Sequence, residues 1–277
     1  MHISDVLNNR DISFIKESKK IQRILSERER FYKTSYGDFS FFEFVEHCFR
    51  SLPLSGNYIG SIEYMSNNDF ADCYSIEDFC LLCEKVVSLL YQTLSLARRN
   101  ATVNFNILEN KTEQVMKVIK FDLQRSGFKI DFQKTDSFGE VAIVYPSDFL
   151  VMKSTEAEPE LAESIINYSR PSLQGNLVEK EKHLHFIIKG VEHIAQDKTF
   201  RYPEIAEQAE TIFNMFHIRH DNIKGKVKNN LLEKMSNKEL EEIFDMGYQL
   251  SLELLILDNF MNIDKKVTDL RKRMKQK

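Results

Sequence analysis

Residues 75–100 read SIEDFCLLCEKVVSLLYQTLSLARRN, and this stretch decides the fold class. Ser75 can cap a helix whose first turn carries two acids, where the helix dipole favours negative charge. Arg98 and Arg99 fall in the last turn, where the dipole favours cations. The apolar residues between these ends recur at helical spacing: Phe79, Leu82, Val86, Leu89, Leu90, Leu94 and Ala97. The stretch therefore predicts a long helix with one buried face.

A second helix and a β-hairpin follow. Residues 111–125 carry apolar side chains on one helical side, and Gly127 stands where a helix often ends in the left-handed conformation. The hydrophobic period then changes to two over 128–133, and an apolar run at 141–145 follows a polar turn. We expect one β-hairpin at about 128–145. Because an isolated hairpin is barely stable, it must pack on helices or join a larger sheet.

The N-terminal segments are also mainly helical by pattern. Residues 1–35 form an amphipathic pattern, and the Phe-rich stretch 36–49 predicts a short helix. The interval 50–74, which contains Pro53, Gly56 and Gly60, is predicted as a long loop.

The C-terminal part predicts a helical bundle. One helix spans 177–195, another begins at Pro203, and a capping box at 236–239 opens a long helix through Leu257. Residues 265–277 hold seven Lys and Arg against one acid, and we interpret them as a solvated helix end, with a local basic patch as the alternative.

The predicted fold class is mainly α: a helical N-terminal part with one β-hairpin (about 128–145), followed by a C-terminal helical bundle. We expect a helical domain with the hairpin at 1–152 and the bundle at 170–277. An acidic connector, 153–169, is expected between them because it holds Pro159 and several Glu. The scarcity of turn residues, 9 Gly and 5 Pro in 277 residues, disfavours a many-stranded architecture.

The overall composition limits which classes of partner and which cellular compartment are expected. The net charge of −4 gives no global attraction to nucleic acid or to anionic membrane, so any such contact must be local. The N-terminus lacks the pattern of a signal peptide, and the apolar stretches are interrupted or short. We therefore expect a cytoplasmic protein with no membrane contact, and four Cys that remain reduced, without disulfides.

The four cysteines offer one candidate metal site. Cys80 and Cys83 have CxxC spacing, and a zinc site can be drawn with Cys73 and either Cys48 or His47. However, the pair lies inside an apolar helix with Leu-Leu between its members, where free Cys packs as a small hydrophobe. We therefore expect core packing, no metal and no cofactor.

The most informative polar cluster follows the helix that starts at Pro203. Its apolar stripe continues from Phe213 and Phe216 onto His220, so Arg219 and His220 are aimed towards the bundle or its mouth. An inward Arg needs a carboxylate or a ligand phosphate beside it. Two interpretations stay open. The first is an RNA or phosphate site, and the second is an interhelical ion pair of Arg219 with a solvated basic loop; the residues of the first are Arg219, His220, His217, Asn222, Lys224, Lys226 and Lys228.

This turn, followed by a capped apolar helix, resembles the HEPN-type helical domains of bacterial abortive-infection and toxin proteins, over roughly residues 177–260. The resemblance implies an RNA-cleaving site across a homodimer, with an Arg followed four to six residues later by a His. Arg219 matches the Arg, and His220 or His217 would act as general base. Positions 224–226 are Lys224-Gly225-Lys226, so the family spacing is not met and the enzymatic question stays open.

The sequence therefore predicts a protein of abortive-infection or phage-defence type that contacts RNA or a nucleotide phosphate around Arg219. The alternative is a non-enzymatic protein-interaction or dimerisation module in which Arg219 forms a structural ion pair. In both cases we expect a homodimer through the C-terminal bundle.

Overall fold

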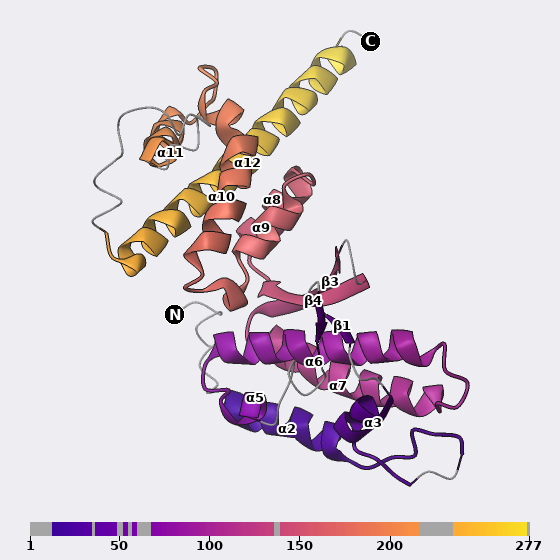
Figure 1. The fold of residues 1–277 in the computed structure, drawn as a ribbon. Coiled ribbons are helices and arrows are strands. Elements are labelled where there is room, and N and C mark those ends of the chain that lie inside the picture. The colour runs from indigo at the N-terminus through magenta and orange to yellow at the C-terminus, as the bar shows by residue number, and fades with distance from the viewer. Residues whose placement is uncertain are drawn as a thin grey trace. The chain divides into compact units, whose positions relative to one another are not determined.

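The computed structural model shows a mainly α protein, as predicted (Figure 1). The chain divides into two compact units, Met1–Ser147 and Asp148–Lys277, and each is described by itself. The structure describes residues 13–34, 37–48, 52–54, 57–59, 68–135, 139–215 and 235–275.

The first unit holds helices α2 (Phe14–Ser26), α3 (Phe41–Cys48), α5 (Asn68–Ala71), α6 (Ile76–Ala97) and α7 (Phe105–Arg125), and strands β1 (Leu52–Leu54), β2 (Asn57–Ile59), β3 (Phe128–Thr135) and β4 (Gly139–Pro146). The second unit holds α8 (Phe149–Ala157), α9 (Ala162–Tyr168), the short 3-10 turn η1 (Pro171–Leu173), α10 (Leu177–Ala195), α11 (Pro203–Met215) and α12 (Asn237–Lys275).

Helix α6 is the central helix of the first unit, and the predicted long capped helix is confirmed. The helix ends at Ala97, so Arg98 and Arg99 lie just beyond the last turn in which they were expected. The Ser75 hydroxyl accepts the N–H of Asp78, and the Asp78 carboxylate accepts the N–H of Ser75, which closes a capping box. By length and composition α6 is the one helix in the described part of the chain that is apolar enough to cross a membrane. Of its most apolar window, 67% is buried inside the protein, as in the core helix of a globular unit.

The predicted β-hairpin is confirmed. It consists of the two strands β3 and β4, and contacts with α6 stabilise it. The register runs from Phe128 opposite Pro146 to Thr135 opposite Gly139.

Three polar side chains, one helical turn apart on α6, bind the backbone of β4. Glu84 accepts the N–H of Val144 at 2.7 Å, and Ser88 accepts the N–H of Ala142 at 2.9 Å. Gln92 donates to a third β4 peptide group, the carbonyl of Glu140, at 3.1 Å. The helix thus supplies partners that a third strand would otherwise provide, because buried peptide groups must be paired.

A shorter strand pair lies in the interval predicted as a loop. Strands β1 and β2 pair in antiparallel fashion, with Leu52 opposite Ile59, and α5 follows before α6. The prediction of a loop over 50–74 is therefore wrong at these positions. Three-residue strands are too short to show an alternating hydrophobic pattern, so no periodic signal marks them in the sequence.

The acidic segment expected as a connector is part of the second unit. Residues 153–169 lie mostly in α8 and α9, where Ile165 and Tyr168 are buried in the core around α10. Of the four acids in this segment, Glu156, Glu160 and Glu163 are exposed, and Glu158 is partly exposed. The acids therefore mark solvated surface of α8, α9 and the turn between them and not a linker, and the division between the two units falls after Ser147.

Candidate functional site

The polar cluster that the sequence singled out lies outside the described residues. Its members are His217, Arg219, His220, Asn222, Lys224, Lys226 and Lys228, and the description stops at Met215 and resumes at Met235. The two interpretations of Arg219 are therefore not tested by the described residues. The structure does place the two helices that flank the cluster, α11 and α12.

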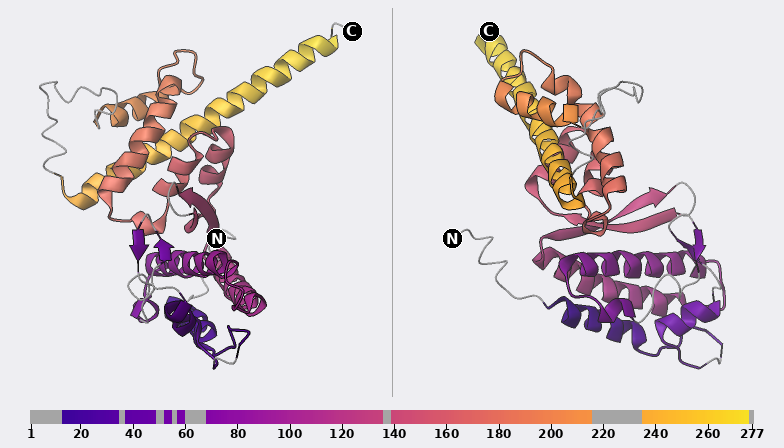
Figure 2. Two further views of the ribbon diagram at one scale, coloured as in Figure 1. Left: turned by 45° about the vertical axis from the view of Figure 1, so that its right-hand side comes forward. Right: turned by 60° about the vertical axis from the view of Figure 1, so that its left-hand side comes forward.

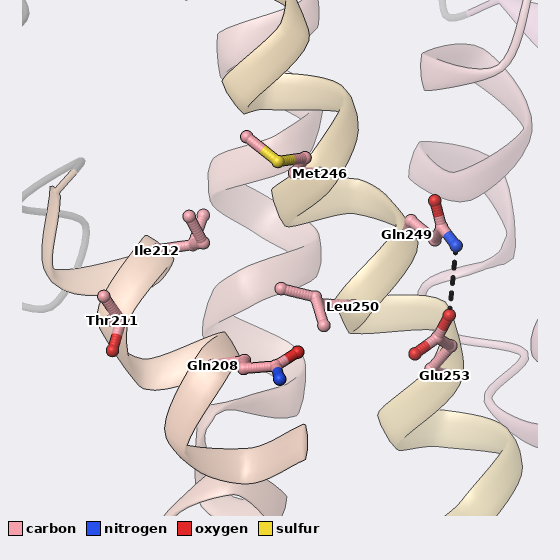
Figure 3. Close-up of a pocket in the computed structure, with 7 residues that line it drawn as sticks. All are labelled: Gln208, Thr211, Ile212, Met246, Gln249, Leu250 and Glu253. Carbon is pink, nitrogen blue, oxygen red and sulfur yellow. Dashed lines mark hydrogen bonds between the residues drawn. The ribbon is translucent and has the colours of Figure 1, made fainter. Parts of the chain in front are cut away.

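A pocket of about 430 Å³ lies between α11 and α12 (Figure 3). In Figure 3, Ile212 of α11 and Leu250 of α12 project into the space between the two helices. The amide of Gln249 donates to Glu253 at 3.1 Å on the outer side of α12. The lining surface is mostly apolar, and its one charged residue is the acid Glu253, so it does not suit a phosphate. The lining residues are Gln208, Thr211, Ile212, Met246, Gln249, Leu250 and Glu253.

The cysteines that the structure describes are buried thiols without disulfide bonds: Cys73, Cys80 and Cys83. Burial raises the pKa of Cys73 to about 12, and burial also raises the pKa of Cys80 and of Cys83. Zinc binds the thiolate, so these thiols are poor metal ligands. Within the described ranges, no group of three or more His, Cys, Asp and Glu is arranged to hold a metal ion.

The first unit contains one buried carboxyl group with an unusual titration. Asp122 on α7 is 1% exposed, and its carboxylate oxygens accept no hydrogen bond from the described residues. Burial, followed by the nearby Glu17 carboxylate, raises the pKa of Asp122 from 3.8 to about 6, while Lys20 and Arg125 oppose the shift. A raised pKa in the folded state means that protonation favours folding.

We expect the first unit to become more stable as pH falls from about 7 to about 5, because folded Asp122 takes up a proton that the unfolded chain does not bind until pH approaches 3.8. The Asp122→Asn variant should lack this gain and should be more resistant to urea than the unchanged chain above pH 7. Urea midpoints measured at several pH values test this. Parallel pH curves for the two proteins would contradict it.

A buried lysine fixes α12 against α10 in the second unit. Lys180 of α10 is 7% exposed, and its Nζ lies 2.8 Å from Glu241 and 3.0 Å from Asp245, both on α12. The Tyr168 hydroxyl also donates to Asp245, at 2.7 Å. The N–H of Gly175 holds the pKa of Glu241 below its usual value, with Lys180 contributing. This network anchors the first turns of α12. The network was not predicted from the sequence.

The C-terminal part of α12 leaves the core of its unit. Figures 1 and 2 show this part of α12 extending beyond α10 and α11. Five large apolar side chains on it are 38–77% exposed, and we call them the α12 stripe: Phe260, Ile263, Val267, Leu270 and Met274. Their successive spacings are three, four, three and four residues, the repeat of a coiled-coil seam.

Basic side chains flank the α12 stripe. Residues 265–274 hold five Lys and Arg against one acid, Asp269. Asp264, beside the stripe, lies 3.6 Å from Arg201 in an exposed ion pair. At the positions that flank a coiled-coil seam, the other charged residues are Lys266, Arg271 and Arg273, and no described carboxylate forms an ion pair with them.

The α12 stripe was not predicted, although its repeat is present in the sequence. The apolar pattern of the long helix was followed only to Leu257, and the basic residues beyond it were interpreted as a solvated end. The repeat from Phe260 to Met274 becomes informative once the structure shows that no other element covers this part of the helix among the described residues.

Comparisons with known proteins found no counterpart: no protein-family model, no curated protein and no solved structure matches this chain. The resemblance to HEPN-type domains therefore stays a prediction from the sequence pattern.

Proposed function

We propose that this chain is a non-enzymatic protein-interaction module that binds a protein partner along the C-terminal part of α12. The observation that carries this proposal is the α12 stripe, five large apolar side chains exposed at coiled-coil spacing. Single exposed apolar residues are ordinary on protein surfaces, but a contiguous row is typical of an interface. Complete burial of one such side chain is worth about 1.5–3 kcal/mol, so a partner that covers the row gains a substantial driving force.

The rest of the second unit can act as a scaffold that holds this helix in place. The Lys180 network and the buried residues Phe244, Leu252 and Leu255 hold the first half of α12 in the bundle. The stripe is thus carried on a helix that is already ordered. A partner then has less conformational entropy to overcome than it would with a segment that folds on binding.

A second candidate function is contact with RNA or a nucleotide phosphate around Arg219, in a cytoplasmic protein of HEPN-like, abortive-infection type. It is supported by the sequence between His217 and Lys238, where six Lys and Arg stand against two acids. The exposed bases of 265–274 would add to the attraction of a phosphate backbone. This candidate rests on residues outside the described structure, so we place it second.

Site-specific photo-cross-linking in cells tests the proposal. A photoreactive amino acid is placed at Leu270, on the stripe, or at Thr268, on another side of the same exposed helix. We expect Leu270 to give a discrete protein adduct and Thr268 to give little or none. Adducts with RNA instead of protein would favour the second candidate. No adduct from either position, with the variants expressed and folded, would contradict the proposal.

A further inference from the structure

The width of the α12 stripe indicates what kind of surface covers it. At about 100° per residue, its five side chains fall within an arc of roughly 80° of the helix circumference. Helices that lie on membranes present a broad apolar face, whereas a narrow row at three-four spacing is the seam of a coiled coil. The geometry therefore favours a second helix over a lipid surface.

The centre of the stripe is also turned away from the centre of the face that α12 buries in its own unit. Phe244, Ser251 and Leu255 lie at the centre of the buried face, which extends to Leu252 and Leu254. The centre of the stripe is turned from the centre of that face by about a third of the circumference. A partner helix can therefore lie along residues 260–274 without displacing α8, α10 or α11. Binding to the stripe and folding of the bundle use different side chains.

The charges beside the stripe disfavour a second copy of this chain as the partner. In a parallel coiled coil, the residue just before one seam position lies opposite the residue just after the next seam position of the other helix. In an antiparallel coiled coil, flanking residues of the same type lie opposite each other: those before a seam position face each other, and so do those after one. In a parallel pair of copies in register, Lys266 would face Arg271. In an antiparallel pair that matches Phe260 with Leu270, Lys266 would face Lys266 and Asp264 would face Asp264. Both arrangements place like charges together.

From this charge pattern we infer that the partner of the α12 stripe is a helix with apolar residues at three-four spacing flanked by Glu or Asp. Acidic flanks would pair with Lys266, Arg271 and Arg273, which no described carboxylate neutralises. This inference rests on the proposed function and names the class of partner. The flanking charges set which helix is accepted, and the apolar seam supplies most of the affinity.

The test uses the full chain and two labelled synthetic helices of three heptads each. Both probes have Ile and Leu on the seam; one carries Glu at the flanking positions and the other carries Lys. We expect fluorescence anisotropy to show at least about tenfold tighter binding of the Glu probe, a difference of about 1.4 kcal/mol. The preference should shrink at high salt, because the flanking pairs are exposed.

Two neighbouring substitutions provide a matched pair. Val267→Asp and Thr268→Asp add the same charge to adjacent exposed residues of nearly equal size, but only Val267 belongs to the stripe. Val267→Asp should weaken binding of the Glu probe at least about tenfold, and Thr268→Asp at most about threefold. Circular dichroism of both variants checks that the helices remain formed.

Three outcomes would overturn the inference. Equal affinity for the Glu and Lys probes would remove the role of the flanking charges. Self-association in sedimentation equilibrium that Val267→Asp abolishes would make the partner a second copy, which contradicts the acidic partner but leaves the interaction function standing. Binding to phosphatidylserine vesicles that Val267→Asp abolishes, without binding to either probe, would contradict both the inference and the proposed function.

Discussion

Replacing Lys111 with methionine is expected to lower the free energy of unfolding of the first unit by about 3–5 kcal/mol. The Lys111 side chain is fully buried on α7, and its Nζ donates to the carbonyl of Ile24 at 2.8 Å. The same Nζ forms an ion pair with Glu29 and lies 3.5 Å from Glu27. A single ammonium group thus binds the last turn of α2 and the acids that follow it, where the helix dipole favours a cation.

Methionine keeps the apolar part of this side chain and removes its charge and donors. The carbonyl of Ile24 and the partly buried carboxylate of Glu29 would then lose their partner, and leaving buried polar groups unpaired is costly. Lys117→Met on the same helix is the matched control, because Lys117 is exposed and its replacement should change stability by less than about 0.5 kcal/mol. Urea unfolding followed by circular dichroism measures both, and equal midpoints for the two variants would contradict the role given to Lys111.

The second large effect is expected at Lys180. Lys180→Met should lower the free energy of unfolding of the second unit by about 2–4 kcal/mol, because Glu241 and Asp245 of α12 lose their shared cation. The loss should be smaller than at Lys111, since the Asp245 side chain is 54% exposed and water can solvate it. In the same variant the pKa of Glu241 should rise, because one of the groups that holds it below its usual value is gone.

Lys182→Met is the control for this prediction. Lys182 lies two residues away on α10 and is 71% exposed, and among the described residues it pairs only with Glu179 of its own helix, at 3.5 Å. Such surface pairs contribute little, so this variant should stay within about 0.5 kcal/mol of the unchanged chain. Urea unfolding combined with hydrogen exchange of α10 amides assigns the transition to the second unit. If Lys180→Met were as mild as Lys182→Met, α12 would be held by apolar packing alone.

The parts of the fold that could be predicted are those with a long repeating pattern. The capped apolar run of α6 and the change of period after Gly127 were sufficient for that helix and for the β3–β4 hairpin. The bonds from Glu84 and Ser88 to β4 could not be predicted, because a polar residue on an apolar helix looks the same whether it faces water or a strand edge.

The long-range contacts of the buried lysines could not be predicted from the sequence either. Lys111 binds a carbonyl 87 residues away, and Lys180 binds a carboxylate 65 residues away, yet both belong to ordinary amphipathic helices. The acids of 153–169 led to the opposite error. Their charge suggested a connector, because the acidic residues of this segment are conspicuous and the buried residues of α9, such as Ile165, are few.

The candidate sites, too, could be predicted only in part from the sequence. Local composition drew attention to Arg219 and His220, whose neighbours lie outside the described residues. The apolar repeat of the α12 stripe is also compatible with a core helix, and half of the same helix is core. Only the three-dimensional arrangement distinguishes the buried residues around Leu252 from the exposed row that begins at Phe260.

Hydrogen exchange of the full chain, with and without the Glu-flanked probe helix, tests the central claim most directly. We predict that the probe slows exchange of amides in residues 260–274, while those in 240–255 and in α10 keep their rates, because the bundle already protects them. Val267→Asp should remove the added protection, and Thr268→Asp should keep it. Protection that appears elsewhere in the second unit, or no change at saturating probe, would contradict a docking role for the α12 stripe.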